Sequence, residues 1–541
     1  MKLRIPMNQS NFIAKKESGQ KSAPVLTSPS RPELFFGLVG AVGTDLARTQ
    51  EWLEHALRAV GYTPLSLRLS SLLSSYFEQA EGGSAGKIVE EDKRINHFME
   101  LGDSLRSKTN GGDAVALLGI PAIRNYRQQK IGDATQPLFG HAFIFNSLKH
   151  PDEVETLRRL YGDSFFVIST YSPVEKRLKA LKKKIAKSYM SMEEEAFTSQ
   201  AKELIDVDQK RPGNDLGQDV RDTFPLADIF ISSEKSGRDQ IKRFVDLLFG
   251  NPFVTPTIDE HGMFHAKAAS LRSADLSRQV GALITTKKGE FIAAGCNEVP
   301  AAGGGAYWEG SGHDRDDDRD FRHGRDANAV MKYEIFSEVF RLLIEKKWIS
   351  PKLQEMQPTH LTEMALNDRD GLSFKDARIA SLIEFGRIVH AEMTAVTEAA
   401  RRGIPIIGST LYCTTFPCHM CARHIIAAGV DRVVYIEPYP KSMTKDLYKF
   451  SVRVEDDKEA LPGAVTFEPF VGIAPSIYMK FFSMPKRKDK KGYTVSWDAA
   501  NLSPRFVSKS ASYIASEAGY IEVVAIAMPN KPGDQGDGRS Q

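Results

Sequence analysis

His390-Ala391-Glu392 and Pro417-Cys418-His419-Met420-Cys421 are the two stretches that decide the fold and the chemistry of this chain. Together they supply one imidazole, two thiols and one carboxylate at a spacing that fits the starts of two helices. Two thiolates and one neutral imidazole provide three ligands of a tetrahedral Zn²⁺ ion and leave the fourth position to water. We therefore expect one Zn²⁺ ion, bound by His390, Cys418 and Cys421.

The full pattern, H-x-E followed by P-C-x-x-C, is typical of zinc-dependent nucleobase deaminases. Bound zinc lowers the pKa of water from about 16 toward 7, which makes hydroxide available at neutral pH for attack on an amidine carbon. A carboxylate that does not bind the metal must carry protons to the ring nitrogen and to the departing amine. We expect Glu392 to be this catalytic residue.

The residues around the two stretches indicate how the chain presents them. Residues two apart do not share a face in the middle of a helix, so His390 and Glu392 belong in a first turn. Two arginines and a glycine at 401–403 favour the end of that helix. Pro417 favours the start of a second helix, where the helix dipole stabilises a thiolate at Cys418. Strands are predicted at 410–415 and 433–436.

Composition narrows the class of protein. The length of 541 residues predicts two domains, and 41% hydrophobic with 26% charged residues is ordinary for a globular chain. A formal net charge of +3 gives no overall nucleic-acid signature, and four cysteines are too few for a disulfide framework. The sequence contains no run of about 18 apolar residues and no apolar signal-peptide core. We expect a cytoplasmic protein without a membrane partner.

The front of the chain begins with a polar stretch, 1–31, which we expect to be a disordered tail. An apolar strand at 33–39 then enters a glycine turn and a helix at 46–60, an order that resembles the phosphate-binding loop of nucleotide kinases. Gly40, Gly43 and Thr44 are the candidate nucleotide-binding residues of this degenerate loop. Leu46 stands where the loop's lysine is needed, which argues against kinase activity and leaves a purely structural turn as the alternative.

Alternation of predicted strands and helices continues to residue 252 and favours an α/β fold with a parallel, doubly wound sheet. We expect residues 32–252 to form a P-loop nucleotide-kinase-like domain. The basic stretch 175–187 is expected to be a helix, either solvated or acting as a lid over an anion. Further strands are predicted at 113–118, 142–145, 165–169 and 228–232.

Residues 253–484 are expected to form the second domain, which contains the zinc motif. A helix at 256–278 and a hairpin from 279–285 and 291–296 precede Asn297, a candidate for contact with a nucleotide sugar. The loop that follows is dense in arginine and aspartate. Its arginines suit bidentate recognition of phosphate, whereas an internally salt-bridged loop is the alternative. The arginines are Arg315, Arg319, Arg322 and Arg325. Residues 485–541 are expected to be a C-terminal extension with a disordered end.

At the zinc motif, at 277–282, at Gly295-Cys296-Asn297 and at 417–435, the chain resembles deoxycytidylate deaminases. Its layout is similar to that of bacterial anti-phage dCTP/dCMP deaminases with a P-loop-like domain in front. The resemblance implies a C-terminal cytidine-deaminase-like α/β/α sandwich, zinc binding by the three residues named above, proton transfer by Glu392, and substrate contacts at Asn297 and Ala391. It also implies a free nucleotide substrate, depletion of dCTP during infection, a homo-oligomer and an inhibitory small non-coding RNA.

Two alternative functions are compatible with some of the same motifs. A deaminase that acts on RNA or DNA uses the same zinc chemistry, but the chain lacks the interleaved basic and aromatic residues that hold single strands. A P-loop regulatory protein whose deaminase half is a sensor is the other alternative, and Leu46 at the lysine position argues against it. Deamination of free deoxycytidine nucleotides is therefore the favoured hypothesis.

Overall fold

The computed structural model describes residues 31–81, 88–211, 213–310, 317–367, 374, 377–439, 442–454, 461–484, 486–498, 503–506 and 512–526. The chain forms two compact units. The first unit comprises Met1–Glu260 together with Pro469–Gln541, and the second comprises His261–Glu468. The sequence places the change of domain at 252/253, close to the first boundary. The expected tail 1–31 lies, apart from Arg31, outside the described residues.

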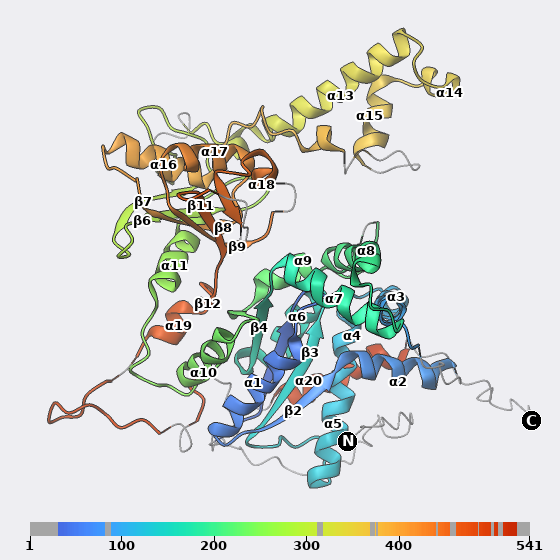
Figure 1. Cartoon of the computed structure of the whole chain (residues 1–541), viewed down its shortest axis with the longest axis vertical. Coiled ribbons are helices and arrows are strands. Elements are labelled where there is room, and N and C mark those ends of the chain that lie inside the picture. Colours follow the sequence, from blue (N-terminus) through green and yellow to red (C-terminus); the bar gives the residue numbers. More distant parts are fainter. Residues whose placement is uncertain are drawn as a thin grey trace, which may run out of the picture. The chain divides into compact units, whose positions relative to one another are not determined.

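The first unit is built on a six-stranded sheet with the order β12-β5-β4-β1-β3-β2 (Figure 1). Strands β2, β3, β1, β4 and β5 run parallel, and β12 pairs antiparallel with β5 at the edge. The parallel sheet expected from the alternation of strands and helices is thus present. The five parallel strands are β1 (Leu34–Val39), β2 (Thr63–Arg68), β3 (His141–Leu148), β4 (Phe165–Tyr171) and β5 (Ile229–Ser232).

Helices cover both faces of this sheet because neighbouring residues of β1 point to opposite sides. Phe36 contacts Phe244 of α10 (Ser236–Leu248) on the face where α1 (Leu46–Ala59) also packs. Phe35 stacks on Tyr161 of α6 (Pro151–Tyr161) on the other face. Because helices pack on both faces of the sheet, every residue of β1 is buried. This burial explains why the strand has an uninterrupted apolar sequence.

Further helices of the first unit lie in the segments that connect its strands. They are α2 (Leu69–Glu81), α3 (Glu91–Thr109), α4 (Ala114–Leu117), α5 (Gly119–Ile131), α7 (Val174–Ser188), α8 (Thr198–Gln209) and α9 (Val220–Thr223). The strand predicted at 113–118 is wrong, because these residues form α4. A short apolar run does not distinguish a buried strand from a buried helical turn.

The C-terminal segment completes the first unit instead of forming a separate extension. Strand β12 (Gly472–Ile473), α19 (Tyr478–Phe482) and α20 (Tyr513–Ile526) belong to it. Ile473 and Phe481 lie in the same buried core as β1 and α10. The expected division at 484/485 therefore differs from the observed one at 468/469, since the sequence carries no local sign that the chain returns to its first sheet. The expected disordered end lies largely outside the described residues.

The second unit has a mixed six-stranded sheet with the order β10-β11-β9-β8-β6-β7. Strand β6 pairs antiparallel with both β7 and β8, and β8 pairs parallel with β9. The predicted hairpin and both strands after the zinc-motif helices are confirmed. The strands are β6 (Gly281–Thr285), β7 (Phe291–Cys296), β8 (Thr410–Thr415), β9 (Arg432–Glu437), β10 (Val452–Val454) and β11 (Val465–Pro469).

This sheet lies between helices, as a cytidine-deaminase-like α/β/α sandwich requires. Ala282, Leu411 and Cys413 point into a core shared with α16 (Ala391–Arg401) and α17 (His419–Ala427). Tyr412 points the other way and meets Gly262 of α11 (Ile258–Ser270). Helix α11 is shorter than the predicted 256–278, because residues 271–280 form turns that lead into β6.

A helical insertion separates β7 from α16. It contains α12 (Asp320–His323), α13 (Ala327–Glu345), α14 (Pro351–Gln354) and α15 (Pro358–Leu366), and a short helix α18 (Thr444–Leu447) follows β9. Phe336 and Phe340 of α13 pack against Leu361 and Met364 of α15 in a small core of their own. None of the helices in the described ranges is long and apolar enough to cross a membrane.

Candidate metal centre and active site

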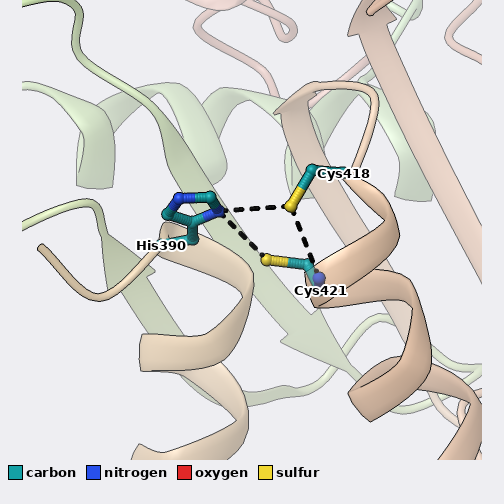
Figure 2. Close-up of side chains that lie close together, drawn as sticks. All are labelled: His390, Cys418 and Cys421. Atoms are coloured by element: carbon teal, nitrogen blue, oxygen red, sulfur yellow. Dashed lines mark hydrogen bonds between the residues drawn. The ribbon is translucent and has the colours of Figure 1, made fainter. Parts of the chain in front are cut away.

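The predicted metal-binding side chains meet at the starts of two helices. His390 and Cys418 are the N-cap residues of α16 and α17, and both have extended backbone conformations. The His390 Nδ1 atom lies 3.4 Å from the Sγ atom of Cys418 and 3.4 Å from that of Cys421 (Figure 2). Both sulfurs point toward the imidazole, so the two helix starts present three ligand atoms to one point.

These three groups fit a metal ion. Their ligand atoms all lie within 4.8 Å of one another, and no other comparable group occurs in the described part of the chain. A tetrahedral zinc ion with bonds of about 2.0–2.3 Å separates its nitrogen and sulfur ligands by about 3.6 Å. The observed separations of 3.4 Å are close to this value. The donor set, two thiols and one imidazole, is also one that zinc prefers.

The pKa values of the three clustered groups are shifted because the groups hydrogen-bond to one another. The hydrogen bond with Cys421 and the nearby imidazole of His390 lower the pKa of Cys418 to about 4. The same bond with Cys418, together with burial, raises the pKa of Cys421. The hydrogen bond with Cys418 raises the pKa of His390. Metal ligands must be deprotonated, so a cation held between the sulfurs and the ring would displace protons from this cluster.

Glu392 lies in the first turn of α16, beside the cluster. Its side chain is almost fully buried, and this burial raises the pKa of the carboxyl group, with a further contribution from Cys418. Glu392 lines the same cavity as His390 and Cys418. The carboxyl group is therefore positioned to exchange protons with a molecule in that cavity without being one of the three clustered ligands.

The cavity next to the cluster has a volume of about 230 Å³. Its wall includes the aromatic side chains of Phe416 and Tyr439 and the guanidinium-bearing residues Arg278 and Arg387. Arg278 lies over the Tyr439 ring, 5.6 Å from the ring centre. Two of the three clustered side chains, aromatic rings and cations are thus combined in one cavity of the second unit.

The two expected substrate-contact residues, Asn297 and Ala391, also line this cavity. Asn297 is buried, its Oδ1 atom accepts a hydrogen bond from the Val280 amide at 2.7 Å, and its Nδ2 atom donates to the Arg278 carbonyl at 2.8 Å. One Nδ2 hydrogen remains for another partner. Asn297 therefore fixes the segment that carries Arg278, in addition to facing the cavity.

Of the arginines that the sequence suggested as phosphate ligands, the three in the described residues, Arg319, Arg322 and Arg325, do not line the cavity. Arg319 pairs with Asp317 at 2.7 Å, and Arg322 pairs with the same carboxylate at 3.2 Å. This arrangement matches the alternative of an internally salt-bridged loop. Arg315 lies outside the described residues.

Arg387 is the cationic residue that sequence reasoning missed. It precedes His390 by three residues, and its Nη1 atom donates to Asp320 at 3.0 Å while Nη2 contacts Asp318. Asp320 also lines the cavity. Proximity to the metal-binding histidine in the sequence was the available signal, but nothing local indicated that the insertion would fold back onto Arg387.

The glycine turn of the first unit joins β1 to α1. Gly43 has a φ of +88°, and Asp45 caps α1 by accepting a hydrogen bond from the Arg48 amide at 3.2 Å. Thr44 closes the turn through its amide, which donates to the Ala41 carbonyl at 3.0 Å. Gly40 contacts the side chain of Lys149, whose Nζ atom donates to the Gly40 carbonyl at 2.9 Å. The strand, glycine turn and helix occur in the expected order, nucleotide binding by Gly40, Gly43 and Thr44 stays a prediction, and a lysine from the end of β3 contacts the turn.

The second unit is similar to a described protein family. Residues 256–437 match the family model described as "Cytidine and deoxycytidylate deaminase zinc-binding region". The matched region begins at α11 and ends with β9, so it contains both helix starts that carry the three clustered ligands.

Several curated proteins are similar to part of this region. ComE operon protein 2 of Bacillus subtilis is 42% identical over 53 residues, which are 10% of this chain and 28% of that protein. Deoxycytidylate deaminase of Enterobacteria phage T4 is 44% identical over 54 residues, 10% of this chain and 28% of the enzyme. Probable deoxycytidylate deaminase of Drosophila melanogaster is 38% identical over 69 residues, 13% and 32% respectively. The chain spans less than a third of the length of these relatives.

Two solved structures of dCMP deaminase from the cyanophage S-TIM5 also match. The complex with dCMP and dUMP is 20% identical, covers 40% of this chain and all of its own, and gives a TM-score of 0.22. The apo form is 18% identical with the same coverage and a TM-score of 0.21. Scores this low support no inference about this chain. Over residues 256–437 the chain is thus similar to the cytidine and deoxycytidylate deaminase zinc-binding region, and within that match lie three clustered side chains that could hold a metal ion.

Proposed function

We propose that the chain is a zinc-dependent deaminase that converts free deoxycytidine nucleotides, dCTP or dCMP, into deoxyuridine nucleotides. The observation that carries the proposal is the composition of one cavity. The cavity brings His390, Cys418 and Glu392 together with two guanidinium groups, those of Arg278 and Arg387. A nucleotide needs both kinds of group, because its base reacts at a metal centre while its phosphates require cations.

In this proposal His390, Cys418 and Cys421 hold a zinc ion. Zinc bound by such ligands supplies Lewis-acid activation of water at neutral pH. Glu392 would carry two protons in turn: the first passes from the attacking water to the ring nitrogen, and the second passes from the hydroxyl group formed by that attack to the departing amine. Burial suits this task, because it raises the pKa of the Glu392 carboxyl group and so favours its acceptance of a proton.

The rest of the cavity orients the nucleotide. Phe416 and Tyr439 offer ring faces and edges to a pyrimidine. Asn297 and Ala391 contact the sugar and the base edge, using the remaining amide hydrogen of Asn297 and the backbone of Ala391. Arg278 and Arg387 bind the phosphates, and Arg387 must exchange Asp318 and Asp320 for a phosphate oxygen when the nucleotide enters.

The cellular role that we attach to this activity is depletion of dCTP during phage infection. This role, a homo-oligomeric state and inhibition by a small non-coding RNA rest on the resemblance of the sequence to anti-phage deaminases. The metal-dependent chemistry and the phosphate contacts do not depend on them.

A substrate panel tests the proposed function. Purified protein is incubated separately with dCMP, dCTP, CTP and a cytosine-containing single-stranded DNA, and uracil products are separated by chromatography. We expect product from dCMP or dCTP and at most traces from DNA. Product from DNA alone would favour a nucleic-acid deaminase and contradict the proposal, as would the absence of product from all four in zinc-loaded protein.

A further inference from the structure

The glycine turn between β1 and α1 holds a negative charge supplied by the chain itself. The Val42 amide donates a hydrogen bond of 2.6 Å to Oδ2 of Asp208, a fully buried residue of α8. The Nζ atom of Lys149 donates to Oδ1 of the same carboxylate at 2.8 Å. One carboxylate therefore receives a backbone amide at one oxygen and an ammonium group at the other.

This pair of donors is the pair that a phosphate-binding loop offers to a phosphate oxygen. Such loops combine backbone amides of a glycine turn with a lysine ammonium group. Here the lysine does not follow the turn, where Leu46 stands, but comes from the residue after β3. Lys149 also bonds the Gly40 carbonyl at 2.9 Å, which fixes its ammonium group against the turn.

Helix α7 closes the turn from another side. Arg177 is buried, and its Nη1 atom donates to the Val42 carbonyl at 3.4 Å. Gly43 lies so close to this helix that an added Cβ atom would stand 2.8 Å from the Arg177 carbonyl oxygen. The basic helix expected to be either solvated or a lid over an anion thus covers the turn at Arg177, and the anion beneath it is Asp208.

We propose that the Asp208 carboxylate occupies the phosphate position of this turn. In the native chain it neutralises Lys149 and satisfies the Val42 amide, so that the first unit needs no nucleotide there and admits none. A second anion beside Asp208 would be placed against a buried like charge, which is strongly unfavourable. Removing the carboxylate leaves an ammonium group and an amide facing an empty space, and the turn then becomes a site for inorganic phosphate.

The test is chemical rescue of Asp208→Ala with inorganic phosphate. Thermal unfolding of the full-length protein is measured in sodium chloride and in sodium phosphate at equal ionic strength and pH. We expect the unfolding midpoint of Asp208→Ala to rise by about 3 °C or more at tens of millimolar phosphate, since a ligand that binds the folded state stabilises it. Wild-type protein and the exposed neighbour variant Asp206→Ala should show no such rise.

A double variant identifies the site. Lys149→Met combined with Asp208→Ala should lose the response to phosphate, because the ammonium group that would bind the anion is gone. The proposal is overturned if Asp208→Ala shows no phosphate-specific stabilisation, or if wild-type protein shows the same rise. Should Asp208→Ala be recovered folded only from phosphate buffer, the proposal is supported. Failure to recover it folded from either buffer counts against it.

Discussion

Gly295→Ala should disable the metal centre from outside the cavity. Gly295 lies in β7, directly beneath the first turn of α16. A Cβ atom at this position would stand 2.4 Å from the Ala391 carbonyl oxygen and 2.6 Å from the Ala395 amide nitrogen, whereas ordinary contacts begin at 3.4 Å. Relief of the closer contact needs a displacement of 3.4 − 2.4 = 1.0 Å. Both atoms belong to the backbone, so a side-chain rotation cannot provide it.

The displacement acts on the catalytic residues because α16 begins immediately after His390 and carries Glu392. A shift of about 1 Å in reacting groups typically costs about 10²-fold in rate. Overpacking of this kind also destabilises a protein by about 1–3 kcal/mol. We therefore expect Gly295→Ala to lose about two orders of magnitude in kcat/KM for the nucleotide and to unfold at a lower temperature.

The assay combines nucleotide turnover, zinc content and thermal unfolding on the same preparation. Ala294→Ser is the matched control, because Ala294 is the exposed neighbour of Gly295 on the same strand. It should behave as wild type in all three measurements. If Gly295→Ala retained wild-type turnover, zinc content and stability, the close packing of β7 on α16 would not position the site and the reasoning would fail.

Three further outcomes follow from the structure. Replacing Cys418 and Cys421 together by alanine should abolish zinc binding in metal analysis, and unchanged zinc content would refute the ligand assignment. Arg387→Ala should raise KM for the nucleotide by roughly 10-fold or more, the usual value of a charged hydrogen bond, whereas Arg319→Ala should not. Arg127→Met should lower the free energy of unfolding by about 3–5 kcal/mol in denaturant titrations, because it removes the guanidinium group that lies closest to two buried carboxylates, those of Glu33 and Glu517; a loss below 1 kcal/mol would contradict this.

Local signals explain which parts of the fold were predictable. The cations and glycine at 401–403 and the proline at 417 mark helix ends through short-range backbone effects, and the structure places α16 and α17 where they indicate. Alternation and turn residues likewise identified the hairpin of β6 and β7. By contrast, the apolar run 113–118 carries no periodicity that separates strand from helix, and it forms α4.

Contacts between residues far apart in the sequence were not predictable. Arg127 is fully buried and bonds Glu517 at 2.6 Å, across 390 residues of sequence. This ion pair and the pairing of β12 with β5 fix the C-terminal segment to the first unit. No pattern within either segment encodes its partner. The contact of Asp208 with the glycine turn and the contact between Asp320 and Arg387 also join residues that are far apart in the sequence.

The residues of the candidate site also differ in how far the sequence could predict them. The clustering of His390, Cys418 and Cys421 could be predicted from the sequence because their spacing is itself the signal, while the catalytic role of Glu392 stays a prediction. The arginines of the cavity wall could not be predicted, since a count of arginines does not reveal which ones the fold brings to the cavity. Arg319 and Arg322 pair with Asp317 and do not line the cavity, whereas Arg278 and Arg387 line it.

The most direct test of the central claim is ammonia release from dCMP and dCTP by wild-type protein and by Glu392→Gln at equal zinc content. Glutamine keeps the size of the side chain but cannot transfer the proton. We expect wild-type protein to release one ammonia per deoxyuridine nucleotide formed, and the variant to be slower by about 10²–10⁴-fold. Equal rates in the two zinc-loaded proteins, or no ammonia from either, would contradict a zinc-dependent nucleotide deaminase that uses Glu392.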